Sequence, residues 1–172
     1  SHSDNLTPVN SAYISRVGAP SINFGLGVFT RDYLHYRLSL HPPIPPLGAS
    51  LTYTSTSLAS FQVSLDGERT YQDVRANVFT AVKLTHATDL GPTKFFDTEM
   101  LQLDFSGGTL PPSVRIRLSP GKPSLGQASV RLLNPDPAPP GLGPQPVWGV
   151  SSFFDLTTDI STDGGSSWRT AT

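Results

Sequence analysis

Acidic residues near the C-terminal end of the chain have the spacing and chemistry to bind a metal ion. Asp155, Asp159 and Asp163 recur at every fourth position of an alternating segment, so an extended strand would place all three on one face. Carboxylate oxygens are the ligands that Ca²⁺ prefers. Neighbours in this set would lie roughly 13 Å apart, so a shared ion needs Asp97 or Asp104 brought alongside by strand pairing. These three aspartates are therefore candidate calcium ligands, and a solvated acidic face is the alternative.

The other residue types that could do chemistry are dispersed. The four histidines lack the spacing that presents two imidazoles to one metal ion, and no serine lies in a Gly-x-Ser-x-Gly elbow. The glycine pairs at 25–27 and 141–143 lack the rest of a phosphate-binding loop. Only Asp97, Glu99 and Asp104 are close enough in sequence to suggest paired glycosidase carboxylates. We therefore expect no enzyme activity and no resident cofactor.

Aromatic side chains are the residues that could bind sugars. Exposed tyrosine and tryptophan rings provide flat surfaces with one polar end, which suits a carbohydrate-binding face. The candidates for such a face are Tyr33, Tyr36, Tyr53 and Trp148. The alternative is that these rings belong to the core, where most aromatic residues of an all-β domain lie. Exposed rings would indicate a carbohydrate-binding module, with calcium as an optional aid.

One motif occurs twice and predicts structure rather than chemistry. Both copies read Ser-x-Asp-Gly-x-x-hydroxyl-aromatic and follow an alternating segment. The aspartate can accept bonds from turn N–H groups, the glycine supplies a positive φ, and the aromatic ring covers the hairpin base. The residues of these two predicted structural turns are Ser64, Asp66, Gly67, Thr70 and Tyr71, and Ser161, Asp163, Gly164, Gly165, Ser167 and Trp168. Glu68 replaces the second glycine in the first copy, which makes that copy the looser match.

The second copy resembles the Asp-box of bacterial sialidases and related repeats, Ser-x-Asp-x-Gly-x-Thr-Trp, with Ser167 in place of threonine. In that family the box is a folding element remote from the catalytic centre, so the resemblance implies no sialidase activity. A wider region is similar to a domain of uncharacterised exported bacterial proteins that often carry a PEP-CTERM sorting signal. That similarity rests on residues 98–111, 117–120 and 151–155. It implies export and an extracellular, structural role.

Short blocks of alternating apolar and polar residues predict the strands that position these motifs. The blocks lie at 34–40, 61–65, 78–84, 101–105, 114–118 and 156–162. No window of eleven residues keeps a helical period free of proline and glycine. Proline-rich segments at 42–46 and 134–146 predict loops, because proline lacks the N–H that a central strand needs. We expect one antiparallel β-sandwich over residues 1–172, jelly-roll or immunoglobulin-like, with minimal helix.

Composition narrows the partners. The 12 basic and 13 acidic residues are scattered and give a net charge of -1, so no basic surface for nucleic acid is expected. The sequence contains no apolar run of 18 residues, so membrane insertion is not expected. Cysteine is absent, which excludes disulfides. The chain begins at Ser1 without a methionine, which suits a mature protein after signal-peptide removal or a tag remnant such as Ser1-His2, and we expect the former.

These observations predict a secreted or cell-surface structural protein that acts through self-assembly or adhesion, as a subunit of an extracellular matrix or filament. The expected partner is a second copy of the chain, or surface glycans. Residues 1–29 are expected to engage that partner, because the glycine-containing apolar segment 12–29 could add a strand to a neighbour's sheet edge. The alternative function is a carbohydrate-binding module.

Overall fold

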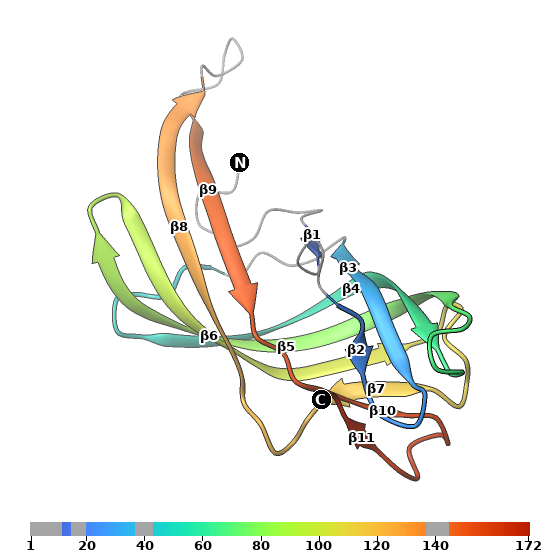
Figure 1. Cartoon of the computed structure of the whole chain (residues 1–172). Helices are drawn as coiled ribbons and strands as arrows, with labels where there is room; N and C mark the ends of the chain where they lie inside the picture. Colours follow the sequence, from blue (N-terminus) through green and yellow to red (C-terminus); the bar gives the residue numbers. More distant parts are fainter. Residues whose placement is uncertain (1–11, 15–19, 37–42, 137–144) are drawn as a thin grey trace.

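The computed structural model describes residues 12–14, 20–36, 43–136 and 145–172, and this part of the chain forms eleven strands and no helix (Figure 1). The strands are β1 (Ala12–Ile14), β2 (Ile22–Asn23), β3 (Phe29–Tyr36), β4 (Ser50–Ser64), β5 (Gln72–Leu90), β6 (Thr93–Ser106), β7 (Arg115–Leu118), β8 (Ser124–Asp136), β9 (Gln145–Phe154), β10 (Thr158–Ser161) and β11 (Arg169–Thr170).

The larger sheet is antiparallel and curled. Its strand order is β1-β3-β4-β5-β6-β8-β9, and β2 also pairs with β3. Strands β4, β5 and β6 run the length of the molecule, and the β8-β9 hairpin rises steeply from one end (Figure 1). The register shifts between Ala81 and Val82 and between His86 and Thr88. Such bulges bend the strand that carries them, so they help to curl the sheet into a half-barrel.

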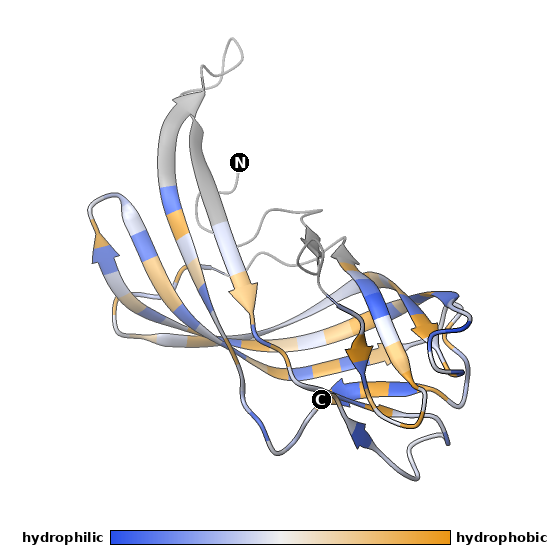
Figure 2. Cartoon of the chain, in the orientation of Figure 1, coloured by the Kyte–Doolittle hydropathy of each residue, from blue (hydrophilic) through white to orange (hydrophobic). Residues whose placement is uncertain are grey.

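Alternation along the long strands gives the sheet one apolar face. In β4 and β5 the buried residues face each other in register, as in the pairs of Phe61 with Val74 and Ala59 with Ala76. The residues between them are mostly polar and more exposed. Figure 2 shows the resulting alternation of hydrophobic and hydrophilic residues along the strands. Burial of the apolar face is the main contribution to stability that this pattern offers.

The smaller sheet, in the order β11-β10-β7, packs on one end of the apolar face. Its Ile116 and Ile160 join the same hydrophobic cluster as Phe61 and Phe105. The prediction of an antiparallel all-β fold is confirmed. The arrangement is a curled half-barrel with a small added sheet and is not clearly a jelly-roll or immunoglobulin-like sandwich, because the second layer covers only part of the first.

The smaller sheet repeats the pairing of β3, β4 and β5. We call residues 20–31 and 61–75 the first repeat, and 106–117 and 158–172 the second. Equivalent positions differ by 86 in the first segment (117 − 31) and by 97 in the second (159 − 62). The equivalent cross-strand pairs are Phe29–Ser64 and Arg115–Ser161, Thr30–Val63 and Ile116–Ile160, Arg31–Gln62 and Arg117–Asp159, and Val63–Gln72 and Ile160–Arg169.

Each repeat also closes against the other at equivalent positions. The N–H of Thr109 donates to the carbonyl of Arg75 at 2.8 Å, and the N–H of Thr172 donates to the carbonyl of Asn23 at 2.9 Å. Asn23 and Thr109 are equivalent (23 + 86), as are Arg75 and Thr172 (75 + 97). The donor and acceptor roles are reversed between the two bonds, but both bonds join the same pair of equivalent positions. The two repeats therefore meet at equivalent places around a common core.

Two segments singled out in the sequence have a defined place. Both strands of the segment 12–29 that precede β3 pair with β3 of the same chain. Strand β1 pairs with Leu34 to Tyr36, and β2 pairs with Phe29 and Thr30. The strands β8 and β9 extend into both ends of the proline-rich segment 134–146, and the register shifts between Leu133 and Asp136. Residues 1–11, 15–19, 37–42 and 137–144 lie outside the described part of the chain, and they include most of the proline-rich segment 134–146 and the first residue of the segment 42–46.

Candidate functional site

The first repeat ends in a turn held by Ser64 and Asp66. The buried Ser64 hydroxyl donates to the Asp66 carboxylate at 2.9 Å and accepts the N–H of Glu68 at 3.0 Å. The other Asp66 contacts come from Thr70, whose N–H and hydroxyl donate to the two carboxylate oxygens at 2.9 and 2.5 Å. The N–H of Gly67 donates to the carbonyl of Gly27 at 2.9 Å and ties the turn to the segment before β3.

The second repeat forms the same turn with the same atoms. The Ser161 hydroxyl donates to Asp163 at 2.7 Å and accepts the N–H of Gly165 at 2.8 Å. Ser167 donates its N–H and hydroxyl to Asp163 at 2.9 and 2.5 Å. The N–H of Gly164 donates to the carbonyl of Ser113 at 2.9 Å, and Ser113 is equivalent to Gly27. These predicted turn residues therefore lie together and bond mainly to one another.

The hydrogen bonds change the acidity of both aspartates. Bonds from the hydroxyl and then the N–H of Thr70 lower the pKa of Asp66 to about 2. Bonds from the hydroxyl and N–H of Ser167, followed by that from the Ser161 hydroxyl, hold the pKa of Asp163 still lower. Both carboxylates are therefore ionised at neutral pH, and their oxygens are used to close the turns.

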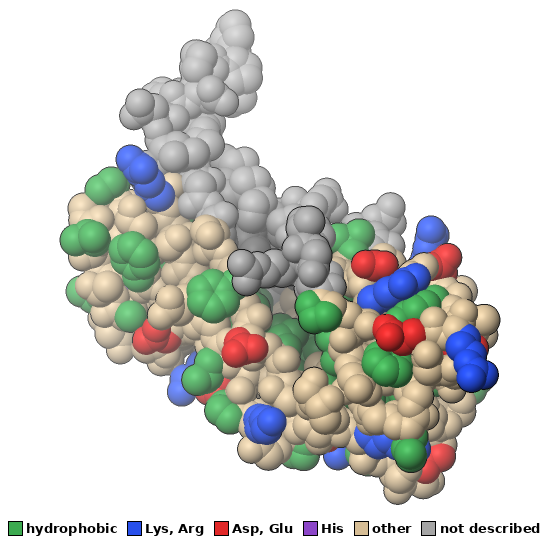
Figure 3. Space-filling model, viewed as in Figure 1, with side chains coloured by type: hydrophobic (Ala, Val, Ile, Leu, Met, Phe, Trp, Pro, Cys, Tyr) green, Lys and Arg blue, Asp and Glu red, His purple; other side chains and the backbone are tan. Residues whose placement is uncertain are grey.

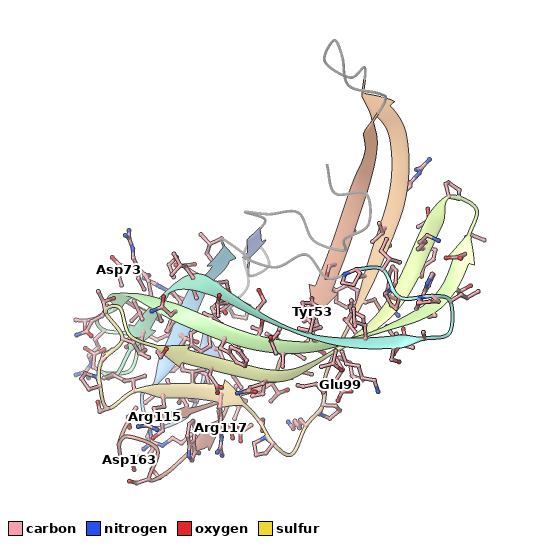
Figure 4. All side chains as sticks on the ribbon, turned by 180° about the vertical axis from the view of Figure 1, so that it is seen from behind. Tyr53, Asp73, Glu99, Arg115, Arg117 and Asp163 are labelled. Carbon is pink, nitrogen blue, oxygen red and sulfur yellow. The ribbon has the colours of Figure 1, made fainter. Side chains whose placement is uncertain are left out.

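An arginine from the neighbouring strand stacks on the aromatic residue of each turn. The guanidinium of Arg31 lies 3.6 Å from the centroid of the Tyr71 ring, and that of Arg117 lies 3.9 Å from the centroid of the Trp168 ring. A cation over an aromatic face is attracted by the ring quadrupole. Figure 4 shows Arg117 and Arg115 on β7, beside the turn that carries Asp163. The two arginine-aromatic pairs are equivalent parts of the two repeats.

The repeats differ in how the space beside the aromatic residue is filled. In the first repeat, Glu68 accepts hydrogen bonds from the hydroxyls of Ser21 and Tyr71, the latter at 2.8 Å. The bond from Ser21, followed by that from Tyr71, lowers the pKa of Glu68. In the second repeat, Gly107 and Gly165 stand at the positions of Ser21 and Glu68. No side chain of these two positions can therefore bridge the space there.

A groove of about 470 Å³ opens at this place in the second repeat. Its lining residues come from the end of β6, the β6-β7 connection, β7 and the second turn, and they include Asp104, Gly107, Arg115, Arg117 and Trp168. Arg117 donates to Asp159 at 3.4 Å. Among the described residues, no carboxylate lies within ion-pair distance of Arg115. The groove therefore presents one unneutralised guanidinium beside an indole ring.

Two of the candidate sugar-binding residues, Tyr33 and Tyr53, pack on the apolar face. Tyr33 packs against Phe61 and Phe105 with ring centroids 6.2 and 6.0 Å apart, and burial raises the pKa of its hydroxyl. Tyr53 also packs against the hydrophobic cluster. Both rings are therefore half-buried against the core. The side chains of Tyr36 and Trp148 lie outside the described part of the structure.

The candidate calcium ligands do not converge. Asp159 is buried and pairs with Arg117, and Asp163 is used by its turn. Asp155 is exposed and precedes β10. In the described ranges, no three His, Asp or Glu side chains lie together in a way that could hold a metal ion.

Sequence reasoning missed three functional candidates. Arg115 and Arg117 flank a core isoleucine on a short strand, and the only signal for them is the offset that aligns Arg117 with Arg31. The third is His86, which is 2% exposed and lies 2.8 Å from the Pro45 carbonyl and 2.7 Å from the Asp89 carboxylate. Nothing local in the sequence indicates that a loop at 43–49 covers this histidine.

Strand β9 forms one end of the larger sheet. In the described part of the chain it pairs with β8 only. Its ten residues, Gln145–Phe154, contain no charged side chain and one proline, Pro146. Phe153 and its diagonal neighbour Leu125 are 59% and 54% exposed on the outer face beside this edge.

Comparison of the chain with protein-family models, with curated proteins and with solved structures found no match in any of the three. No helix that could cross a membrane occurs in the described residues.

Proposed function

We propose that the protein is a non-catalytic structural subunit of the cell exterior that assembles with copies of itself through strand β9. The observation that carries the proposal is a ten-residue edge strand without a single charge. Natural sheet edges are normally blocked by charged side chains, prolines, bulges or a covering element, because their free N–H and C=O groups otherwise pair with another chain. The only proline of β9 is its second residue, which leaves the following eight N–H groups intact.

The occupant of this edge is a second copy of the chain. Two β9 strands can pair antiparallel about a two-fold axis, which is the commonest symmetry of protein dimers. The pairing would place the exposed Phe153 of each copy on a strand that contacts its partner. The visible face of the molecule in Figure 3 shows hydrophobic, basic and acidic side chains interspersed, which favours assembly through a strand edge over assembly through that face.

The location outside the cell is part of the proposal. What supports it is the resemblance of residues 98–111, 117–120 and 151–155 to a domain of exported bacterial proteins. We also propose that the fold is a sandwich in one region only, where β7, β10 and β11 pack on the curled sheet.

Two serines that face each other across β8 and β9 provide the test. Ser129 and Ser151 are direct cross-strand neighbours, so Ser151→Lys places a charge on the edge strand and Ser129→Lys places the same charge on the adjacent interior strand. We expect the wild-type chain to form dimers in sedimentation equilibrium. Ser151→Lys should weaken the dimer at least tenfold, because lysine on an edge strand opposes strand addition.

Ser129→Lys is the matched control and should leave the dimer intact. Circular dichroism spectra should be the same for all three proteins. A wild-type chain that stays monomeric at millimolar concentration would contradict the proposal, and so would equal weakening by both variants.

A further inference from the structure

The open groove in the second repeat points to a ligand, because the first repeat shows what occupies the equivalent space when it is filled. There the carboxylate of Glu68 sits between the hydroxyls of Ser21 and Tyr71. Its ionised form is stabilised by these bonds and by the charge of Arg31. The first repeat therefore supplies an internal carboxylate at this position.

The second repeat lacks that carboxylate, and the glycine that replaces Glu68 lies beside two residues that line the groove. A Cβ atom on Gly165 would lie 3.5 Å from Cδ of Arg115 and 3.7 Å from the Trp168 ring, so a side chain from this position would start at the wall of the groove. Gly107, at the position of Ser21, also lines the groove. Both residues that would fill the space are thus glycine.

The groove of the second repeat has also gained a positive charge that the first repeat lacks. Arg115 stands at the position of Phe29, on the same face of β7 as Arg117. The two guanidinium groups start from positions about 7 Å apart along the strand. Asp159 neutralises Arg117, but no described carboxylate pairs with Arg115. A planar guanidinium offers two parallel donors that match one carboxylate.

We propose that this groove binds a carboxylated glycan, a chain of uronic acid units, with one carboxylate of the ligand paired with Arg115 where the first repeat places Glu68. The sugar ring lies beside the Trp168 indole, whose flat surface suits a ring with apolar and polar faces. The volume of about 470 Å³ is in the usual range for small-ligand sites.

Asp104 favours a glycan over an acidic peptide. Asp104 lines the groove, and its carboxylate, which accepts a hydrogen bond from the side-chain amide of Gln102, can only accept when ionised. The hydroxyl groups of a sugar can donate to it, whereas the ionised side chains of a polyacidic peptide offer no donor. An acidic glycan therefore satisfies Arg115 and Asp104 together.

The binding test uses a hexamer of galacturonic acid as the probe and its fully methyl-esterified form as the matched control, with isothermal titration calorimetry at low salt. We expect the free acid to bind and the ester to bind at least tenfold more weakly, because the ester has the same size but no charge. Poly-L-glutamate should bind more weakly than the acid hexamer.

The variants exchange residues between the two repeats. Arg115→Phe installs the first-repeat residue and should weaken binding of the acid hexamer at least tenfold. Gly165→Glu places an internal carboxylate in the groove and should compete with the ligand in the same way. Glu68→Gln changes the first repeat instead and should leave the affinity unchanged. Thermal melts of all variants check that each is folded.

The inference goes beyond self-assembly and stands if β9 does not pair, since Arg115 lies on a different strand. Failure of the acid hexamer to bind folded wild-type protein would overturn it. Equal binding by wild type and folded Arg115→Phe would overturn it as well. Tighter binding of poly-L-glutamate would assign the groove to acidic peptides and exclude the glycan.

Discussion

The hydroxyl of Ser161 should be one of the most important side-chain groups for stability outside the apolar core. The side chain is 1% exposed. It donates to Asp163 at 2.7 Å and accepts the N–H of Gly165 at 2.8 Å, while a third contact, with the N–H of Asp163, is long at 3.4 Å. Ser161→Ala removes all three contacts and adds none.

The expected loss follows from the two short bonds. A typical buried hydrogen bond contributes about 1 kcal/mol net, so Ser161→Ala should lower the free energy of unfolding by about 2 kcal/mol. With an m-value of about 2 kcal/mol/M, the urea midpoint should fall by about 1 M. Ser64→Ala should have nearly the same effect, because Ser64 makes the equivalent bonds in the first repeat.

The measurement is urea denaturation followed by tryptophan fluorescence, with Ser151→Ala as the control. Ser151 is exposed on β9, and its replacement should change stability by less than about 0.5 kcal/mol. If Ser161→Ala shifts the midpoint no more than this control does, the hydroxyl does not hold the turn. If only one of Ser64 and Ser161 matters, the two repeats are not energetically equivalent.

Three further changes test the hairpins and the core. The folded-state pKa of Asp66 is about 2 and that of Asp163 is lower still, below the unfolded value of about 4, so their stabilisation is present above about pH 4 and is lost as the pH falls toward 2. Asp66→Asn should accordingly flatten the fall of the urea midpoint between pH 4 and 2, and an unchanged slope would contradict this. Ile160→Ala should cost about 2–5 kcal/mol in urea denaturation, because the side chain is almost fully buried. His86→Leu should speed amide hydrogen exchange at Gly48, because the ring would no longer bind the loop at 43–49. The N–H of Gly48 donates to the carbonyl of residue 86 and so reports on this loop. Unchanged exchange would show that the loop does not need the ring.

The turns could be predicted from the sequence because their bonds are local. Asp66 accepts from Thr70, four residues along the chain, and Ser64 accepts from Glu68 at the same spacing. A motif of eight residues therefore contains every group that closes the turn. The backbone conformation of the two turns also matches at Glu68, which adopts a positive φ of 67° where the second copy has glycine.

The first half of β4 gave no sequence signal because its buried positions are small and polar. Ser55 and Ser57 point to the core, opposite Thr80 and Val78. A period-two pattern of apolar residues cannot be seen where hydroxyl side chains occupy both faces of a strand. Only the pairing with β5 assigns this segment to the sheet.

The groove was invisible in the sequence because it depends on contacts between distant segments. Arg115 and Trp168 are 53 positions apart (168 − 115), and the wall opposite them comes from the β6-β7 connection. Equivalent residues of the two repeats are 86 positions apart in the first segment and 97 in the second. The difference arises because the connection between the two segments is 11 residues longer in the second repeat (97 − 86). A search for one fixed period finds the turns alone.

The comparison between the repeats separates residues that maintain the fold from residues that are free to serve another purpose. Positions kept in both copies, such as the serine and aspartate of each turn, make the bonds that close the hairpin. Three of the positions that differ are Ser21, Phe29 and Glu68 in the first copy, whose counterparts are Gly107, Arg115 and Gly165. Gly107 and Arg115 line the groove, and Gly165 lies beside the side chains of Arg115 and Trp168. Together the three changes remove a carboxylate and add a cation, while the carboxylate gained at Asp159 pairs with Arg117. Turn closure and core packing require none of them, since the first repeat folds the same way without them. The groove and its guanidinium are therefore features that the second repeat has in addition to the shared fold.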